Sequence, residues 1–199
     1  MRSTRKLNDD KKDTMLNDLD HQLFLFFNGL HVDWLDPVMA FISSEMGWLP
    51  FYAVLVFLVF KKYKWKGLWV ILGVAVLIAC SDQLSAHVFK PVFHRLRPCH
   101  DPLIQDLVYL PYGHCGGQYG FISSHACNTF ALASFIFMTM KKHYSKIGWL
   151  MFIWAAVVSY SRIYMGVHFP GDIICGAAVG MILGFGIGYL LERKLRQSN

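Results

Sequence analysis

The chain has 199 residues and a formal net charge of +6, with 55% hydrophobic and only 16% charged residues. Soluble domains usually carry about 25% charged residues, so the deficit indicates a chain surrounded by lipid. The length is that of one domain. Its lysines cluster in short segments between apolar runs and form no basic stripe with interleaved aromatics, which argues against nucleic acid as a partner.

The N-terminal part divides into a polar tail and a short apolar stretch. Residues 1–18 mix basic and acidic side chains, so we expect a solvated tail without regular structure and without a signal peptide. Residues 19–30 are rich in Leu and Phe but too short to span hydrocarbon comfortably. They predict an interfacial helix ending near Asn28. Residues 19–199 then form one membrane domain.

Apolar runs approaching the roughly 20 residues of a membrane-spanning helix fill most of the remaining chain. Pro37 suits the first turn of the first run, and Pro50 is expected to kink it. The predicted fold is all-α: a polytopic membrane helix bundle of five transmembrane helices with an N-terminal interfacial helix, or of six if residues 19–30 also cross. The five expected spans are residues 38–60, 67–89, 121–140, 147–161 and 173–191.

Basic residues gather at one end of these runs. Because successive spans cross the membrane in opposite directions, three basic segments lie on the same side: residues 61–66, 141–146 and 192–196. Together they hold ten Lys and Arg residues, so the positive-inside rule places that side in the cytoplasm. The loops at 90–120 and 161–171 then lie on the extracytoplasmic side. For a bacterial protein this predicts the inner membrane with a periplasmic site. The number of subunits does not follow from the sequence.

Glycines repeat along the last predicted span at Gly176, Gly180, Gly184 and Gly188. An interval of four residues places them on one stripe of a helix, where small residues allow the backbone of a neighbouring helix to approach closely. This pattern predicts a packing contact.

Three polar clusters fall at the extracytoplasmic ends of the predicted helices. Such groups are costly at membrane depth unless they bind something or react. Topology brings the clusters to one face, so we expect them to form a common site. They are Lys90 to Arg97 and Pro98; Ser123, Ser124 and His125; and Ser161 and Arg162 through His168 to Asp172.

The residue types in these clusters suit a phosphate group. The guanidinium groups of Arg97 and Arg162 can each engage two phosphate oxygens, and Lys90 adds a point charge. Ser123 and Ser124, at the start of a helix, offer hydroxyl groups and free backbone N–H groups.

The histidines and the aspartate suit phosphoryl transfer. His168 can attack phosphorus while Asp172 binds its other ring nitrogen, and His125 can protonate the leaving oxygen and then activate water. Taken singly, these residues also have structural explanations: cations at helix ends anchor to headgroups, and His168 and Asp172 are spaced as a helical pair. Convergence of all three clusters favours chemistry.

The ordered set resembles the three-part signature of the type 2 phosphatidic acid phosphatase superfamily, which includes lipid phosphatases, glucose-6-phosphatase and vanadium haloperoxidases. Lys90, six residues and then Arg97 and Pro98 match its first motif. The third motif is matched by Ser161, Arg162, His168 and Asp172. The middle motif is usually Pro-Ser-Gly-His, and here Ile122 and Ser124 replace the proline and glycine. The resemblance covers residues 90–172.

This resemblance implies an integral membrane lipid phosphatase that works without metal or other cofactor through a phosphohistidine on His168. His125 would be the general acid, and Asp172 would support His168. Phosphate would be bound by Lys90, Arg97, Arg162, Ser123 and Ser124.

The expected substrate is a lipid phosphomonoester or diphosphate. Undecaprenyl diphosphate is the first choice, because carriers of this kind reach the outer membrane surface, and phosphatidic acid, phosphatidylglycerol phosphate and the phosphates of lipid A are rivals. Two alternatives come from other classes: a non-enzymatic transporter or lipid-binding protein that holds phosphate, and a metal-dependent hydrolase.

Two features lie outside the clusters. Asp82, within the second predicted span, is either a functional carboxylate or a hydrogen-bond partner of a neighbouring helix. Cys99 and Cys115 lie in the outer loop beside His100 and His114, where adjacent ligands fit tetrahedral zinc poorly. We expect a Cys99–Cys115 disulfide in an oxidising compartment. By closing a loop it would stabilise the folded protein by about 3 kcal/mol in the chain-entropy account.

Overall fold

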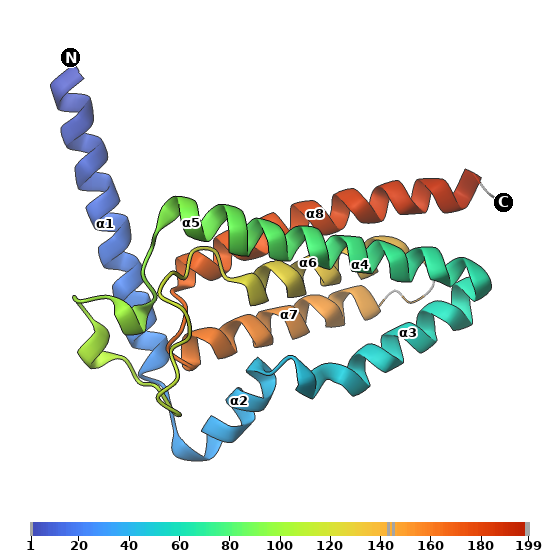
Figure 1. Cartoon of the computed structure of the whole chain (residues 1–199), viewed down its shortest axis with the longest axis horizontal. Helices are drawn as coiled ribbons and strands as arrows, with labels where there is room; N and C mark the ends of the chain where they lie inside the picture. The colour runs from blue at the N-terminus through green and yellow to red at the C-terminus, as the bar shows by residue number, and fades with distance from the viewer. Residues whose placement is uncertain (1, 143, 145, 198–199) are drawn as a thin grey trace.

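The computed structural model describes residues 2–142, 144 and 146–197, with side chains from residue 15 onward. The described residues form helices and loops without a named strand; an isolated bridge joins Leu96 to Tyr119. Long helices lie side by side as a bundle, with α2 and α3 along one flank (Figure 1). The bounds are α2 Asp36–Ser43, α3 Leu49–Tyr63, α4 Gly67–Gln83, α6 Ser124–Met140, α7 Ile147–Tyr164 and α8 Pro170–Gln197.

Three helical segments in the described part of the chain are long and apolar enough to cross a membrane: Met46–Phe93, Ile147–Tyr164 and Pro170–Gln197. The first comprises α3 and α4, joined by a turn at Lys64–Lys66. Buried apolar side chains from α3, α4, α6 and α7 form the main core between these helices. The prediction of an all-helical membrane bundle is confirmed.

The N-terminal segment differs from its prediction. Helix α1 runs from Arg2 to Asn28, so residues 2–18 of the predicted tail are helical and the prediction of a structureless tail is wrong for them. Once a helix is nucleated, each added residue costs little and adds a hydrogen bond, and Arg, Lys, Leu and Met all favour helix. The predicted end at Asn28 is correct. Helix α1 stands steeply against the bundle axis (Figure 1), and its exposed apolar stripe suits a membrane interface: Leu16, Leu19, Leu23 and Phe26.

The first predicted span is also not a single kinked helix. Helix α2 ends at Ser43, and Ser44 is extended with φ −80° and ψ 132°. Pro50 instead lies in the first turn of α3, where its missing N–H costs nothing. The break carries residues 43–45 toward one end of the bundle.

The second span continues further than predicted. Helix α4 passes through a π-helical stretch, Leu84–Phe89, into the short helix α5, Lys90–Phe93. Widened turns of this type occur often at functional sites. Lys90 therefore lies within a continuous helical segment.

Helices α6 and α8 pack backbone against backbone. A Cβ atom added to Gly180 would lie 2.2 Å from the carbonyl oxygen of Cys127, and one added to Gly184 would lie 2.2 Å from that of Ala131. Gly176 likewise faces the carbonyl of Ser123 at 2.7 Å. The predicted glycine contact is confirmed.

Substituting Gly180→Ala should force α6 and α8 apart, because the new methyl group meets a backbone carbonyl that cannot rotate away. Overpacking of this kind costs about 1–3 kcal/mol, so the midpoint of thermal unfolding in detergent should fall by several degrees. Gly186→Ala on the same helix is the matched control, since nothing lies within 4 Å of its Cβ position. Equal losses in both variants would contradict the proposed contact.

Candidate active site

The three polar clusters meet at one end of the bundle. The starts of α6 and α8, the end of α7 and the long loop after α5 lie at the end beside α1, and the α3–α4 turn and the C-terminal end of α8 lie at the opposite end (Figure 1). The backbone N–H of Ser123 donates to the carbonyl of Asp172 at 3.1 Å, which joins the first turns of α6 and α8. The topology expected for the clusters is thus present in the structure.

Asp172 is oriented by a hydrogen bond at the start of α8. It occupies the first turn of α8, and its Oδ2 accepts a hydrogen bond from the backbone N–H of Phe169 at 3.0 Å. An acidic side chain that reaches back to the N–H before its helix is half of a capping box. The Asp172 side chain is fully buried, so its orientation is fixed by these contacts.

His168 lies in the turn between α7 and α8 and faces Asp172. Its Nδ1 is 3.5 Å from Asp172 Oδ2, and among the described residues this nitrogen has no hydrogen-bond partner. Catalytic contacts are often this long before substrate binds and shorten in the complex. Burial, which outweighs the attraction of Asp172 and is helped by the nearby charges of Arg97 and Arg162, lowers the pKa of His168 to about 4. The imidazole is therefore neutral near pH 7, as a nucleophile must be.

Two arginines bring unsatisfied donors to this end of the bundle. Arg97 Nη1 donates to the carbonyl of Val167 at 3.3 Å, and Arg162 Nη1 donates to Ser43 Oγ. The Nε atoms of both arginines are buried and have no partner among the described residues. Buried donors rarely stay unpaired, and the oxygens of a phosphate group would satisfy them.

Lys90 reaches the second cluster. Its Nζ donates to Ser124 Oγ at 3.1 Å, and Ser85 in the π-helical stretch donates to the same hydroxyl at 2.9 Å. Lys90 also lies within electrostatic reach of Arg97, Arg162 and Asp172. The serine that replaces the usual glycine of the middle motif therefore contacts the lysine of the first motif.

Ser123 has a different position. It is fully buried and caps α6, accepting a bond from the backbone N–H of Ala126 at 3.4 Å. Its side chain supports the helix start, and the expected phosphate contact falls more naturally to Ser124.

His125 connects the cation cluster to a pocket. It interacts electrostatically with Arg97, Arg162 and His168, and its Nε2 is 3.9 Å from the exposed carboxylate of Glu45. Of the predicted catalytic and phosphate-binding residues, His125 alone lines this pocket.

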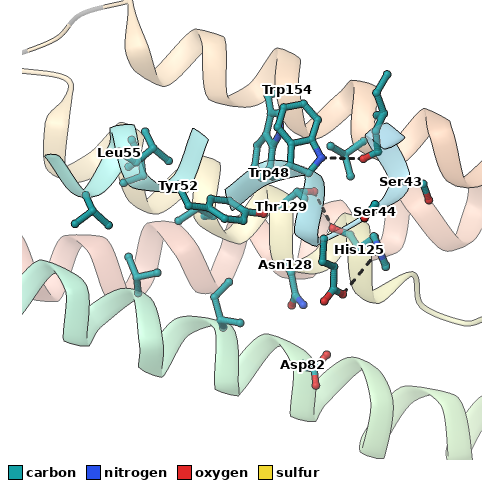
Figure 2. A pocket seen from close by; sticks show the side chains of 18 of the residues that line it. Ser43, Ser44, Trp48, Tyr52, Leu55, Asp82, His125, Asn128, Thr129 and Trp154 are labelled. Atoms are coloured by element: carbon teal, nitrogen blue, oxygen red, sulfur yellow. Dashed lines mark hydrogen bonds and ion pairs between the residues drawn. The ribbon is translucent and has the colours of Figure 1, made fainter. Parts of the chain in front are cut away.

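The pocket has a volume of about 540 Å³ and lies between the α2–α3 segment and helices α4, α6 and α7. Its apolar wall includes Trp48, Tyr52, Leu55 and Trp154, whereas Asp82 and Asn128 bring polar groups toward His125 (Figure 2). Glu45 also lines the pocket beside His125. Ser81 donates to Asn128 Oδ1 at 2.5 Å, which orients the Asn128 side chain at the pocket wall. Asp82 thus faces this pocket, and the structure gives it a location consistent with a functional carboxylate.

Sequence reasoning missed Arg95, Asp20 and Ser43. Arg95 bonds to Asp172 at 2.8 Å and to Asp20 of α1 at 2.5 Å. Arg95 stands among the six residues between Lys90 and Arg97, which the motif treats as a spacer. An extra arginine beside two motif cations was the available signal, but nothing in the sequence placed α1 next to it.

The outer loop carries the expected cysteine pair. The structure joins Cys99 and Cys115 in a disulfide with a Cα–Cα distance of 6.1 Å. The ligand atoms of Cys99, His100 and Cys115 lie within 4.8 Å of one another. Because both sulfurs are used in the bond, they are not available as thiolate ligands for zinc.

Comparison with known proteins agrees with this geometry. The chain is 38% identical over 184 residues to a lipid A 4'-phosphatase of Bacteroides thetaiotaomicron, covering 90% of this chain and 80% of the relative. It is 40% identical over 168 residues to a lipid A 4'-phosphatase of Porphyromonas gingivalis, covering 84% and 70%. An undecaprenyl-diphosphatase of Sulfolobus acidocaldarius is 30% identical over 176 residues, covering 82% and 74%.

The fold has a solved counterpart. The crystal structure of a transmembrane PAP2-type phosphatidylglycerolphosphate phosphatase from Bacillus subtilis superposes with a TM-score of 0.64 at 24% identity, covering 90% of this chain and 87% of that chain. Residues 66–196, which include all three polar clusters, match the PAP2 superfamily. The chain is therefore a membrane-embedded phosphatase of the PAP2 superfamily.

Proposed function

We propose that this protein removes the phosphate from a lipid phosphomonoester whose leaving group is a sugar, as in lipid A. The observation that carries the reaction type is the convergence of unsatisfied arginine donors on a buried His168–Asp172 pair. The pocket beside His125 supports a lipid substrate, and two relatives named lipid A 4'-phosphatase support the sugar. Undecaprenyl diphosphate, the first choice from sequence, becomes the second candidate.

The proposed reaction has two displacement steps at phosphorus, the first by His168 and the second by water. Lys90, Arg97 and Arg162 hold the non-bridging oxygens and stabilise the charge of the transferring group. The neutral His168 attacks phosphorus through Nε2, so an N–P bond forms as the bond to the leaving oxygen breaks. Asp172 stabilises the positive charge that develops on the ring.

His125 acts as the general acid and then as the general base. It gives a proton to the leaving sugar oxygen and then takes one from a water molecule, which attacks the phosphohistidine and releases inorganic phosphate. Because His125 lines the pocket, the leaving group lies on the pocket side of the transferring phosphate. The apolar wall then holds part of the lipid.

The charge of the pocket rim favours a neutral leaving group. The Glu45 carboxylate lies 3.9 Å from His125 Nε2, and Asp82 lines the same pocket (Figure 2). Hydroxyl or amide groups of a sugar can donate to both carboxylates. A diphosphate would place a second phosphate at the same point, next to like charges. This repulsion is worth about 1–4 kcal/mol for charges about 4 Å apart near a protein surface.

The orientation proposed for the protein follows from its basic segments. The Lys and Arg residues of the α3–α4 turn and of the C-terminal end of α8 are remote from the site (Figure 1). We infer that this end is cytoplasmic and that the site faces the periplasm in a bacterial inner membrane.

Phosphate release from a lipid panel tests the reaction. Purified protein should act on a lipid A-type glycolipid monophosphate with undiminished rate in chelator, and His168→Ala should lower kcat by roughly a thousandfold or more because the nucleophile is gone. A phosphate-binding transporter would show no turnover with any lipid. Activity that survives His168→Ala, or that chelator abolishes, would contradict the mechanism.

Selectivity tests the substrate. Neutralising the pocket rim by Glu45→Gln and Asp82→Asn should raise kcat/KM for a prenyl diphosphate relative to the glycolipid monophosphate by about tenfold, because a like-charge repulsion is removed. Asp106→Asn, an exposed carboxylate of the outer loop, is the control and should leave the ratio unchanged. An unchanged ratio in all three variants would reject the role of the rim.

Reporter fusions test the orientation. A C-terminal green fluorescent protein should fluoresce and a C-terminal alkaline phosphatase should be inactive, since the former folds in the cytoplasm and the latter only outside it. The opposite pattern would invert the proposed topology.

A further inference from the structure

Arg95 makes two ionic contacts that the family motif does not account for. Its Nη1 donates to Asp172 Oδ1 at 2.8 Å, and its Nη2 donates to Asp20 Oδ2 at 2.5 Å. The exposed fractions of the side chains are 23% for Arg95, 13% for Asp20 and zero for Asp172. Charges this well shielded act on one another with little screening by salt.

The surrounding chain holds Arg95 in place from several directions. Its guanidinium lies 4.4 Å from the centre of the Phe169 ring, and its backbone carbonyl accepts the N–H of Gly120 at 2.8 Å. The second oxygen of Asp20 accepts the N–H of Gly171, in the first turn of α8, at 2.8 Å. Asp20 therefore bonds both to Arg95 and to the helix that carries Asp172.

Helix α1 is itself anchored beside this group. The side-chain amide of Asn28 donates to the carbonyls of Tyr109, Ile163 and Tyr164 at 3.0–3.1 Å. Its Oδ1 accepts the N–H of Tyr109 at 2.8 Å. A buried asparagine with all these partners fixes the end of α1, and so the position of Asp20 two turns earlier.

These contacts leave Asp172 shared between one cation, Arg95, and the neutral imidazole of His168. One carboxylate oxygen bonds to Arg95, and the other bonds to the Phe169 N–H and faces His168. The positive charge of Arg95 offsets part of the negative charge of Asp172, which would otherwise stabilise an imidazolium at His168. Asp20 in turn offsets part of the positive charge of Arg95. The groups form a row of alternating sign from α1 to the nucleophile.

We propose that Arg95 is a positioning residue for the nucleophile: it fixes the rotamer of Asp172, and Asp20 of the N-terminal helix sets how strongly Asp172 acts on His168. The proposal rests on the proposed role of His168. Its competitor is a purely structural ion pair that attaches α1 to the bundle.

Other charged or titratable groups face this part of the protein and stay unchanged in the test. Arg97 and Arg162 act on His168, and so does His125 from α6. Asp172 is also within reach of Lys90 and of Cys175 on α8, and the His21 ring packs 5.1 Å from Phe169. A shift in the pH midpoint of His168 that appears only when Arg95 or Asp20 is changed therefore reports on the contacts that link Asp20, Arg95, Asp172 and His168.

Titration of His168 decides between the two explanations. In full-length protein with 13C-labelled histidine in micelles, the His168 resonance is identified by its loss in His168→Asn. Arg95→Gln should raise the His168 midpoint by about half to one pH unit, because it removes a cation that opposes the imidazolium. Asp20→Asn should lower the midpoint, because Arg95 then acts with its full charge. Asp18→Asn, an exposed carboxylate two residues earlier on α1, is the matched control.

Kinetics provide a second readout. Arg95→Gln should lower kcat about tenfold with KM changed less than twofold, because Asp172 is then no longer held in the rotamer that faces His168. Arg95→Lys should restore part of kcat. The acid limb of kcat should move up in Arg95→Gln and down in Asp20→Asn, with Asp18→Asn at the wild-type position.

Shifts in the same direction in both variants, or thermal destabilisation without any shift, would reject the proposal in favour of the structural ion pair. If Arg95→Gln is not recovered folded, Asp20→Asn against Asp18→Asn carries the same test. A wild-type protein that releases no phosphate from any lipid would reject the proposed function, whereas the titration would still decide the role of Arg95.

Discussion

The site depends on the close approach of α6 and α8. His125 comes from the first turn of α6 and Asp172 from the first turn of α8, so the separation of these helices sets the distance between the proposed acid and the support of the nucleophile. The glycine stripe lets the two backbones meet, and the Ser123 N–H bonds to the Asp172 carbonyl at the site itself. Packing along the whole interface therefore positions groups at one end of it.

The same end concentrates positive charge that the protein only partly neutralises. Asp172 is shared between Arg95 and His168, while the Nε atoms of Arg97 and Arg162 have no partner among the described residues. Leaving donors unpaired in a buried place is unfavourable for folding alone. It becomes favourable when an anion supplies the missing acceptors, which supports the proposed binding of a phosphate group.

Structural features that depend on a regular residue interval could be predicted from the sequence. The four-residue glycine interval predicted that the last helix packs closely on a neighbour, which the structure identifies as α6. The positions of Lys90, His125 and His168 at the ends of predicted helices placed the clusters together. Departures arose where tertiary contacts decide. The break at Ser44 carries Ser43 to Arg162, a contact between residues that no local pattern relates. Helix α1 likewise extends through a polar segment whose composition alone indicated a tail.

The role of α1 shows why a motif understates a site. Residues 66–196 define the family match, and they contain His125, His168, Asp172 and the three proposed phosphate-binding cations. Yet Asp172 bonds to Arg95, and Arg95 bonds to Asp20, which lies outside that range. Electrostatic influence follows distance in the folded chain and not position in a motif. Since Asp20 also bonds to the N–H of Gly171, the helix that rests at the bundle end contacts both the cation next to Asp172 and the backbone that orients it. The charge environment of the proposed nucleophile is therefore a property of the folded N-terminal helix as well as of the three polar clusters.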